Sequence, residues 1–153
     1  MIYIIVDIYR QSNVEVKEKK MVKMPEEVMD MFNDWDAFKT IATVDTAGKL
    51  NVAPIKTFSV VDEETLAFGY VFPGKTKDNM EATKKVAVTA FKGSTGYQIK
   101  GTFQGFLTSG PIFDEKKEQV KGKLKLDVKG AGIIKVEEVY SVSVGPDAGK
   151  KLV

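Results

Sequence analysis

The sequence contains no cysteine and no histidine among its 153 residues. These two absences exclude disulfide bridges, thiolate nucleophiles, zinc sites built from cysteine or histidine, and catalytic triads that depend on an imidazole base. A chain of this length buries enough surface to fold without covalent or metal cross-links. Any chemistry that the protein supports must therefore proceed without histidine as acid or base.

Arginine is almost absent as well, because Arg10 is the only one and the other 22 basic residues are lysines. Bidentate guanidinium clamps on phosphate or carboxylate groups are therefore excluded from most of the chain. The densest basic stretch is interrupted by acidic residues and contains no aromatic side chain on which a nucleic-acid base would stack. We expect it to form a solvent-exposed helix face, which comprises Lys116, Lys117, Lys121, Lys123, Lys125 and Lys129.

Long hydrophobic runs are also missing. The apolar segment at residues 1–6 is too short to span a bilayer, follows no basic region and precedes no small-residue cleavage site. Together with the lack of disulfides, this favours a cytoplasmic protein. We divide the chain into an N-terminal appendage, residues 1–20, in which residues 2–9 are typical of a strand, and a single domain, residues 21–153. Met21 and Met24 are both candidates for the start of the functional protein.

The first part of the domain changes from a helical to a strand-like period. Pro25 and the two glutamates after it suit a first helical turn, because proline has no N–H to lose there and carboxylates favour the positive end of the helix dipole. Apolar residues then recur at helical spacing, which predicts a helix packed on a core: Val28, Met31, Phe32 and Trp35. Three antiparallel strands should follow, at residues 38–45, 50–61 and 65–72.

Proline and glycine add detail to the rest of the pattern. Pro54 cannot donate to a central ladder, so its strand should lie at a sheet edge or bulge there. Gly101 and Gly105 share one face of a strand, which predicts a sharp bend of the kind found in a small barrel wall. We expect a short helix capped by Thr76, a second helix opened by Pro111 and running to about residue 125, and strands at residues 86–91, 97–107 and 132–144.

Strands outnumber helices in this pattern, and the two do not alternate strictly. Six or more strands with two or three short helices predict a mainly β, α+β fold in which the strands form an antiparallel barrel. A doubly wound parallel sheet is disfavoured.

Residues 69–76 match the G-x-x-x-x-G-K-[ST] pattern of nucleotide-binding P-loops letter for letter. The context argues against a nucleotide hydrolase, because the Tyr-Val-Phe sequence favours extended structure, Pro73 offers no N–H, and the following helix is short. That activity stays a disfavoured alternative. The loop still suits a terminal phosphomonoester, since Lys75 offers a charge, Thr76 a hydroxyl, and the helix N-terminus unpaired N–H groups.

Four segments carry a resemblance by their order and spacing: Ile41–Val44 followed by a turn, Asn51–Thr57, Gly74–Asn79 and Tyr97–Gly101. With them the chain resembles the pyridoxamine 5'-phosphate oxidase-like family of FMN-binding split-barrel proteins, over about residues 25–144. The resemblance implies an antiparallel split β-barrel with two or three short flanking helices. It also implies a homodimer that holds FMN at the subunit interface.

The resemblance assigns roles to particular residues. The strand at residues 53–57 corresponds to one that lies along the isoalloxazine ring, residues 69–72 to a strand end in the same pocket, and Lys75 with Thr76 to the loop that takes the phosphate. The implied cofactor contacts are Pro54, Ile55, Lys56, Thr57, Gly69, Tyr70, Lys75, Thr76, Asn79 and Gln98. Such groups suit FMN, which has an apolar ring, a polar edge and an anionic tail. No catalytic or metal-binding residue is predicted.

The sequence also departs from the family. Pyridoxamine phosphate oxidase itself grips its substrate with arginine and histidine, so that activity is not expected here. We expect an FMN-binding oxidoreductase or electron carrier in which the flavin carries the electrons and the protein tunes them. One alternative is a split-barrel binding module for another cofactor, heme or a deazaflavin, without chemistry of its own. Heme would need tyrosine or methionine as its axial ligand.

Overall fold

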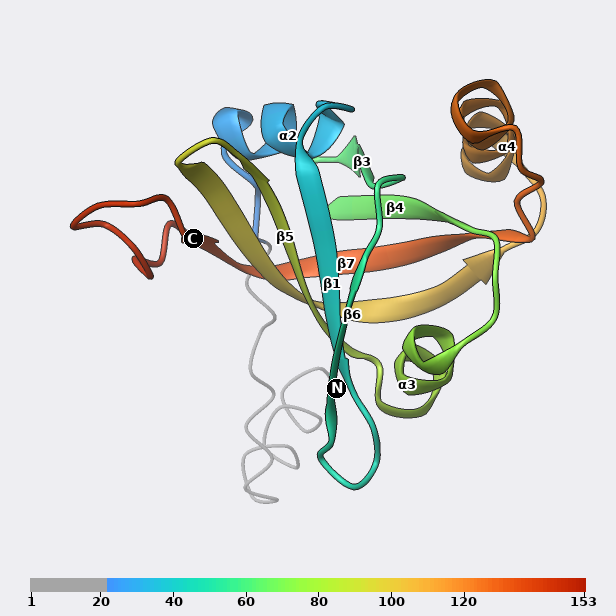
Figure 1. Cartoon of the computed structure of the whole chain (residues 1–153), viewed down its shortest axis with the longest axis horizontal. Helices are drawn as coiled ribbons and strands as arrows, with labels where there is room; N and C mark the ends of the chain where they lie inside the picture. Colours follow the sequence, from blue (N-terminus) through green and yellow to red (C-terminus); the bar gives the residue numbers. More distant parts are fainter. Residues whose placement is uncertain (1–21) are drawn as a thin grey trace, which may run out of the picture.

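The computed structural model describes residues 22–153 (Figure 1), so the strand expected over residues 2–9 lies outside the described part. Seven strands form one antiparallel sheet in the order β2-β1-β5-β6-β7-β4-β3. They are β1 (Phe38–Val44), β2 (Leu50–Pro54), β3 (Ser59–Asp62), β4 (Thr65–Tyr70), β5 (Lys85–Lys92), β6 (Thr95–Leu107) and β7 (Gly130–Ser141). Three helices accompany them within the described part of the chain: α2 (Glu26–Asn33), α3 (Lys75–Thr83) and α4 (Pro111–Leu124). The mainly β, α+β architecture with three flanking helices is confirmed.

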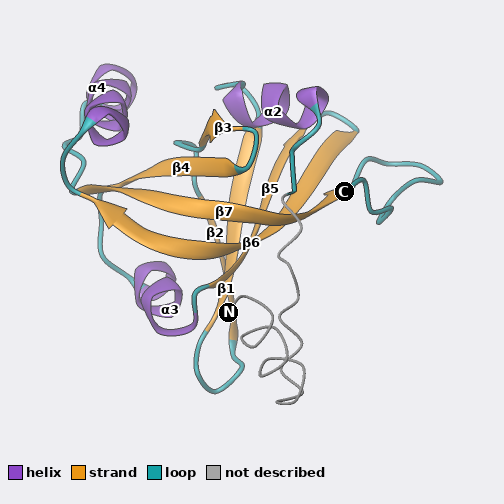
Figure 2. Cartoon of the chain, turned by 180° about the vertical axis from the view of Figure 1, so that it is seen from behind, coloured by secondary structure: helices purple, strands orange, loops and turns teal. Residues whose placement is uncertain are grey.

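The sheet curls so that β1, β2 and β5 run across β4, β6 and β7, as Figures 1 and 2 both show. Its edge strands are β2 and β3, which do not pair with each other within residues 22–153, and this opening makes the barrel a split one. Helix α2 covers one side of the curled sheet. Helices α3 and α4 flank the same end of β4, β6 and β7 (Figure 2).

Glycines produce the curvature of β6, as the sequence predicted. The pairing of β6 with β7 shifts register between Lys100 and Gly101 and again between Phe103 and Phe106. A Cβ at Gly101 would lie 2.3 Å from the carbonyl oxygen of Lys135, so only glycine permits this approach. The second shift contains Gly105, whose φ of +105° favours glycine.

The strand expected at residues 50–61 is wrong, because the chain breaks there into two strands. Strand β2 ends at Pro54 and pairs with β1 at one edge, whereas β3 begins at Ser59 and pairs with β4 at the other edge. Pro54 has no N–H to extend a ladder, and its position at a sheet edge is as predicted. Residues 55–58 therefore cross between the two edges of the barrel, and we call them the β2–β3 connection.

The core lies between α2 and the concave face of the sheet. Val28 and Phe32 of α2 are fully buried, and the Phe32 ring meets Phe58 edge to face at 6.3 Å between centroids. Burial of each such side chain contributes about 2 kcal/mol of hydrophobic free energy. The predicted helix is confirmed, but it ends at Asn33, so Trp35 lies beyond it. No helix within residues 22–153 has the length and apolar content needed to cross a membrane.

Two local expectations are also wrong. Thr76 is not the N-cap of α3, because the helix already begins at Lys75 with Gly74 in the capping position. The lysine-rich helix face is not wholly exposed, because Lys116 is buried while the other five lysines of that group face solvent. Both differences matter for the site described next.

Candidate functional site

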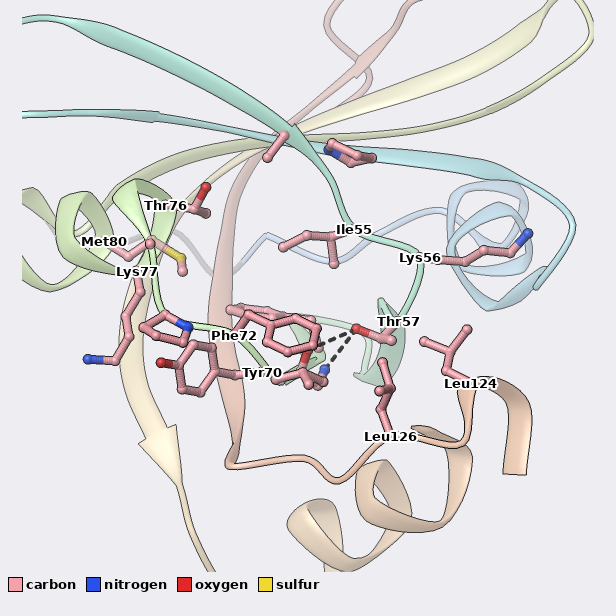
Figure 3. A pocket seen from close by; sticks show the side chains of 17 residues that line it. Ile55, Lys56, Thr57, Tyr70, Phe72, Thr76, Lys77, Met80, Leu124 and Leu126 are labelled. Carbon is pink, nitrogen blue, oxygen red and sulfur yellow. Dashed lines mark hydrogen bonds between the residues drawn. The ribbon is translucent and has the colours of Figure 1, made fainter. Parts of the chain in front are cut away.

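A cavity of about 380 Å³ gathers most of the residues expected to bind a cofactor (Figure 3). It lies where the β2–β3 connection, the end of β4, the first turns of α3 and the segment after α4 meet. Its volume is within the range typical of small-molecule sites. The lining residues are Ala53, Pro54, Ile55, Lys56, Thr57, Phe68, Gly69, Tyr70, Val71, Phe72, Pro73, Gly74, Thr76, Lys77, Met80, Leu124 and Leu126.

The walls of this cavity are mostly apolar and aromatic. The Tyr70 ring packs against Phe106 with centroids 4.9 Å apart, which fixes it at the side of the cavity. Lys56 and Lys77 are the charged lining residues, and no carboxylate lines the cavity within the described part of the chain. A hydrogen bond to Glu81 raises the pKa of Lys77, so this lysine is charged at neutral pH. The cavity therefore suits a flat apolar ligand with a negatively charged group.

The β2–β3 connection is fixed to β4 by one side chain. The Gly69 N–H donates to Thr57 Oγ1 at 2.9 Å, and Thr57 Oγ1 donates to the Gly69 carbonyl at 3.2 Å (Figure 3). Residue 69 must be small, because a Cβ there would lie 2.8 Å from Val120 of α4. Within residues 22–153, the backbone N–H groups of Lys56 and Thr57 have no hydrogen-bond partner. These two donors are available to a ligand, whereas the Thr57 hydroxyl is already engaged.

The first turn of α3 presents unpaired donors at one end of the cavity. No side chain caps the helix, and its first N–H with a helical partner is that of Asp78, which bonds to the Gly74 carbonyl at 3.1 Å. The preceding N–H groups are therefore free, and they carry the positive end of the helix dipole. Thr76 places its hydroxyl at the same end of the cavity.

A chain of side-chain hydrogen bonds orients the Thr76 hydroxyl. Asn51 Nδ2 of β2 donates to Thr76 Oγ1 at 3.1 Å and to Thr43 Oγ1 at 3.2 Å, and Asn79 Nδ2 donates to the same Thr43 oxygen at 3.1 Å. Because Thr76 Oγ1 accepts from the amide, its own hydrogen remains free to donate to a ligand. Asn79 thus acts through the network and does not line the cavity.

Other predicted residues lie elsewhere. Lys75 is exposed on the first turn of α3 and does not line the cavity. The Lys56 side chain extends away from the cavity (Figure 3), and its ammonium lies 5.4 Å from the centre of the Trp35 ring. Gln98 lies in β6, where it is aligned with Thr89 of β5, and it does not line the cavity either.

Several lining residues were not predicted. Lys77 and Met80 lie on the same side of α3 as Thr76, at helical spacing, so the sequence held a usable signal for them. Asn51 belongs to a segment that carries the family resemblance, yet only the fold brings it to Thr76. Leu124 and Leu126 reach the cavity because α4 packs beside β4, a contact that no local pattern predicts.

The outer face of β2, β1 and β5 is apolar and exposed. Leu50 and Val52 are 85% and 69% exposed, and Phe38 stacks on Phe91 with ring centroids 5.7 Å apart. The strand registers align one row across this face, from Pro54 through Thr40 and Thr89 to Gln98. Pro54 also lines the cavity, so the outer face adjoins the site.

The P-loop pattern does not have the surroundings of a nucleotide hydrolase. Gly69 and Tyr70 belong to strand β4, whose partners β3 and β7 are both antiparallel to it. A nucleotide-binding P-loop joins a strand of a parallel sheet to a helix. Only the phosphate-binding potential of the α3 N-terminus remains from that pattern.

No family model matches the chain. An uncharacterised protein of Methanocaldococcus jannaschii is 35% identical over 135 residues, which cover 85% of this chain and 88% of that protein. Among solved structures, HupZ of Group A Streptococcus has a TM-score of 0.69 at 26% identity and covers 82% of this chain and 99% of its own. An FMN-binding protein of Syntrophomonas wolfei has a TM-score of 0.69 at 17% identity, covering 92% and 99% of the two chains.

Further solved structures share the fold at 13–22% identity. They include a pyridoxamine 5'-phosphate oxidase-like protein of Lactobacillus delbrueckii, an F420 reductase, and HutZ, the heme storage protein of Vibrio cholerae. The cofactors in these names differ, so the fold alone does not select one. By sequence the chain belongs to one family with the Methanocaldococcus jannaschii protein, and by fold it is a split barrel like the FMN-binding and pyridoxamine 5'-phosphate oxidase-like proteins.

Proposed function

We propose that the protein is an FMN-binding flavoprotein that acts as an oxidoreductase or electron carrier. The observation that carries this proposal is the composition of one cavity, which combines aromatic and aliphatic walls, lysine as the charged lining among the described residues, and the free N-terminus of α3 at one end. FMN presents the matching groups, a flat ring and a dianionic phosphate. The cytoplasmic location stays a prediction, which cell fractionation tests.

The phosphate is assigned to the first turn of α3. The free N–H groups of this turn and the Thr76 hydroxyl, oriented by Asn51, supply hydrogen-bond donors to an anion. Lys75, exposed on the same turn, adds positive charge from the rim, whereas the charge of Lys77 in the lining is partly offset by its salt bridge to Glu81. Charge-assisted hydrogen bonds of this kind contribute about 1.5–3 kcal/mol each.

The ring is assigned to the space between the β2–β3 connection and Tyr70. Ile55, Tyr70 and Phe72 face this space from two sides (Figure 3), and the free N–H groups of Lys56 and Thr57 suit the polar edge of the ring. Bound FMN would supply hydride or single-electron transfer. The chain's own residues would bind it, orient it and exclude water, and the lining within residues 22–153 contains no carboxylate to move protons.

We also propose that the protein is a homodimer formed through the outer face of β2, β1 and β5. An exposed apolar sheet surface of this kind is unusual for a monomer and typical of an interface. The face adjoins the cavity at Pro54, so a second copy seated on it would cover part of the site. Gln98 lies in the same cross-strand row and would contact the cofactor of the partner copy.

Heme or a deazaflavin is the second candidate for the cavity. Tyr70 and Met80 both line it, and these are the residue types left to ligate heme iron in a chain without histidine and cysteine. Solved structures named as an F420 reductase and as a heme storage protein share the fold. Absorption spectra after addition of FMN, hemin or F420 separate the three cofactors.

The phosphate assignment is tested by replacing Lys75 and Thr76 together with alanine. FMN should bind about 100-fold more weakly to this variant, while riboflavin, which has no phosphate, should bind as it does to the wild type. A matched control replaces Thr46 and Lys49, an exposed pair on the β1–β2 turn, with alanine and should change neither affinity. Equal FMN affinity of all three proteins would overturn the assignment.

The dimer is tested by sedimentation. The wild type should sediment at twice the 16.9 kDa of one chain, whereas Val52→Glu should sediment as a monomer because a buried carboxylate would disrupt the apolar interface. Val61→Glu is the matched control, since Val61 is also exposed but lies on the opposite edge of the sheet. A dimeric Val52→Glu variant would contradict this interface.

A further inference from the structure

Two buried lysines lie behind the cavity, and the proposed cofactor contacts do not use them. Lys116 of α4 is 1% exposed and Lys39 of β1 is 4% exposed. Neither forms a salt bridge with any residue in the range 22–153. Buried ammonium groups are costly unless they are paired or hydrogen-bonded, so their contacts show what they stabilise.

Both ammonium groups bind the same short segment, the β2–β3 connection. Lys116 Nζ donates to the Thr57 carbonyl at 2.7 Å, to Gln119 Oε1 at 3.1 Å and to Ser59 Oγ. Lys39 Nζ donates to the Phe58 carbonyl at 3.2 Å. Two positive charges thus fix the successive carbonyl groups of Thr57 and Phe58. Of these two residues, Thr57 lines the cavity.

The charges lie on the side of the connection away from solvent. Burial is the main cause that lowers the pKa values of Lys39 and Lys116 to about 8, and the charge of Lys39 lowers the pKa of Lys116 further. Both lysines are therefore largely charged at neutral pH. Asp34 and Glu115 are the acidic groups that act on them in the opposite direction, and neither forms a hydrogen bond with either lysine. The Thr57 carbonyl thus has buried positive charge behind it, and within residues 22–153 no carboxylate forms a salt bridge with either lysine.

We propose that Lys116 and Lys39 are positioning residues that set the charge preference of the cavity, so that it binds a ring carrying negative charge more tightly than a neutral one. The inference rests on the proposed function and extends it from binding FMN to selecting its redox state. Two electrons and one proton convert the neutral oxidised ring into its anionic reduced form, which adds one negative charge. Buried positive charge behind Thr57 favours that form by Coulomb attraction.

The test compares wild type, Lys116→Met and Lys117→Met, each reconstituted with FMN and reduced anaerobically with dithionite against reference dyes. Lys117 is the matched control, because it is the exposed neighbour on the same helix. In Lys116→Met the affinity for reduced relative to oxidised FMN should fall about tenfold, because one buried positive charge behind the cavity is removed. For a two-electron couple this is a drop of about 30 mV in midpoint potential. Lys117→Met should match the wild type.

Two outcomes would overturn the inference. An unchanged ratio in Lys116→Met, with FMN still bound, would overturn it alone and leave the proposed function standing. A wild-type protein that binds no FMN would overturn the proposed function and this inference with it. Lys39→Met is the second variant, and the affinity for reduced relative to oxidised FMN should fall in it as well. If Lys116→Met does not fold, Lys39→Met still tests the inference.

Discussion

Replacing Lys116 with methionine should change how stability responds to alkaline pH. Burial in the folded protein lowers the pKa of Lys116 from 10.5 to about 8. Between these two values the unfolded chain binds more protons than the folded one, so the free energy of unfolding rises with pH. Below pH 8 both states are protonated and the full cost of the buried charge is present. At 1.36 kcal/mol per pKa unit, relief of that cost is worth about 3 kcal/mol.

Urea unfolding of wild type, Lys116→Met and Lys117→Met at pH 7, 8, 9 and 10 measures this difference. From pH 7 to pH 10 the wild type should gain about 2–3 kcal/mol relative to Lys116→Met, while Lys117→Met should follow the wild type. Lys39 is present in all three proteins, as are the exposed lysines and tyrosines, so their titration largely cancels in the comparison. Parallel pH curves for wild type and Lys116→Met would refute the assignment of a buried, titrating ammonium group.

Three further predictions follow from the geometry. Gly69→Ala should lower the free energy of unfolding by about 1–3 kcal/mol, because the new Cβ would lie 2.8 Å from a methyl group of α4. Gly122→Ala should raise it by about 0.5–1 kcal/mol, because Gly122 lies within a helix and its Cβ would meet open space. Denaturant titration measures both changes. Asn51→Asp should weaken FMN binding at least about tenfold and leave riboflavin unaffected, since a carboxylate would take the Thr76 hydrogen and repel phosphate. Lys56→Met should leave FMN bound with nearly the same midpoint potential, because the Lys56 ammonium lies over the Trp35 ring and away from the cavity, and a clearly lower potential would show that this lysine acts on the ring.

Local patterns were sufficient to predict most of the elements. The helical spacing of Val28 and Phe32 and the alternation along β6 reflect burial on one face, which sequence records directly. Pro54 and the glycines of β6 also act locally, through a missing donor and a missing Cβ, so the edge and the bends were predictable from residue type.

Contacts between distant segments account for what the sequence did not predict. The pattern at residues 50–61 is typical of one continuous strand, but its two halves pair at opposite edges of the sheet. This pairing depends on the positions of β1 and β4, which the local pattern does not contain. Lys116 lies in a run of exposed lysines, and only the approach of Thr57 and Ser59 provides the acceptors that permit its burial. Thr76 has the composition of an N-cap, yet Asn51 engages its hydroxyl from another strand.

The residues of the candidate site were also predictable only where local sequence determines their position. Residues in contiguous segments, such as Ile55 and Tyr70, could be assigned to one pocket from the resemblance, and the fold places them around one cavity. The position of charge was harder to predict, because Lys75 and Lys77 are only two residues apart and helical geometry alone decides which one borders the cavity. To decide which lysine borders the cavity, the first residue of α3 must be known to within one position, and helix ends are the positions that propensity determines least well.

The central claim is that the start of α3 binds the phosphate of a flavin held in the adjoining cavity. Equilibrium titration of the apoprotein with FMN and with riboflavin, followed by flavin fluorescence, tests it most directly because the two ligands differ only in the phosphate. FMN should bind at least about 100-fold more tightly than riboflavin. Equal affinity for the two ligands, or no binding of either, would contradict it.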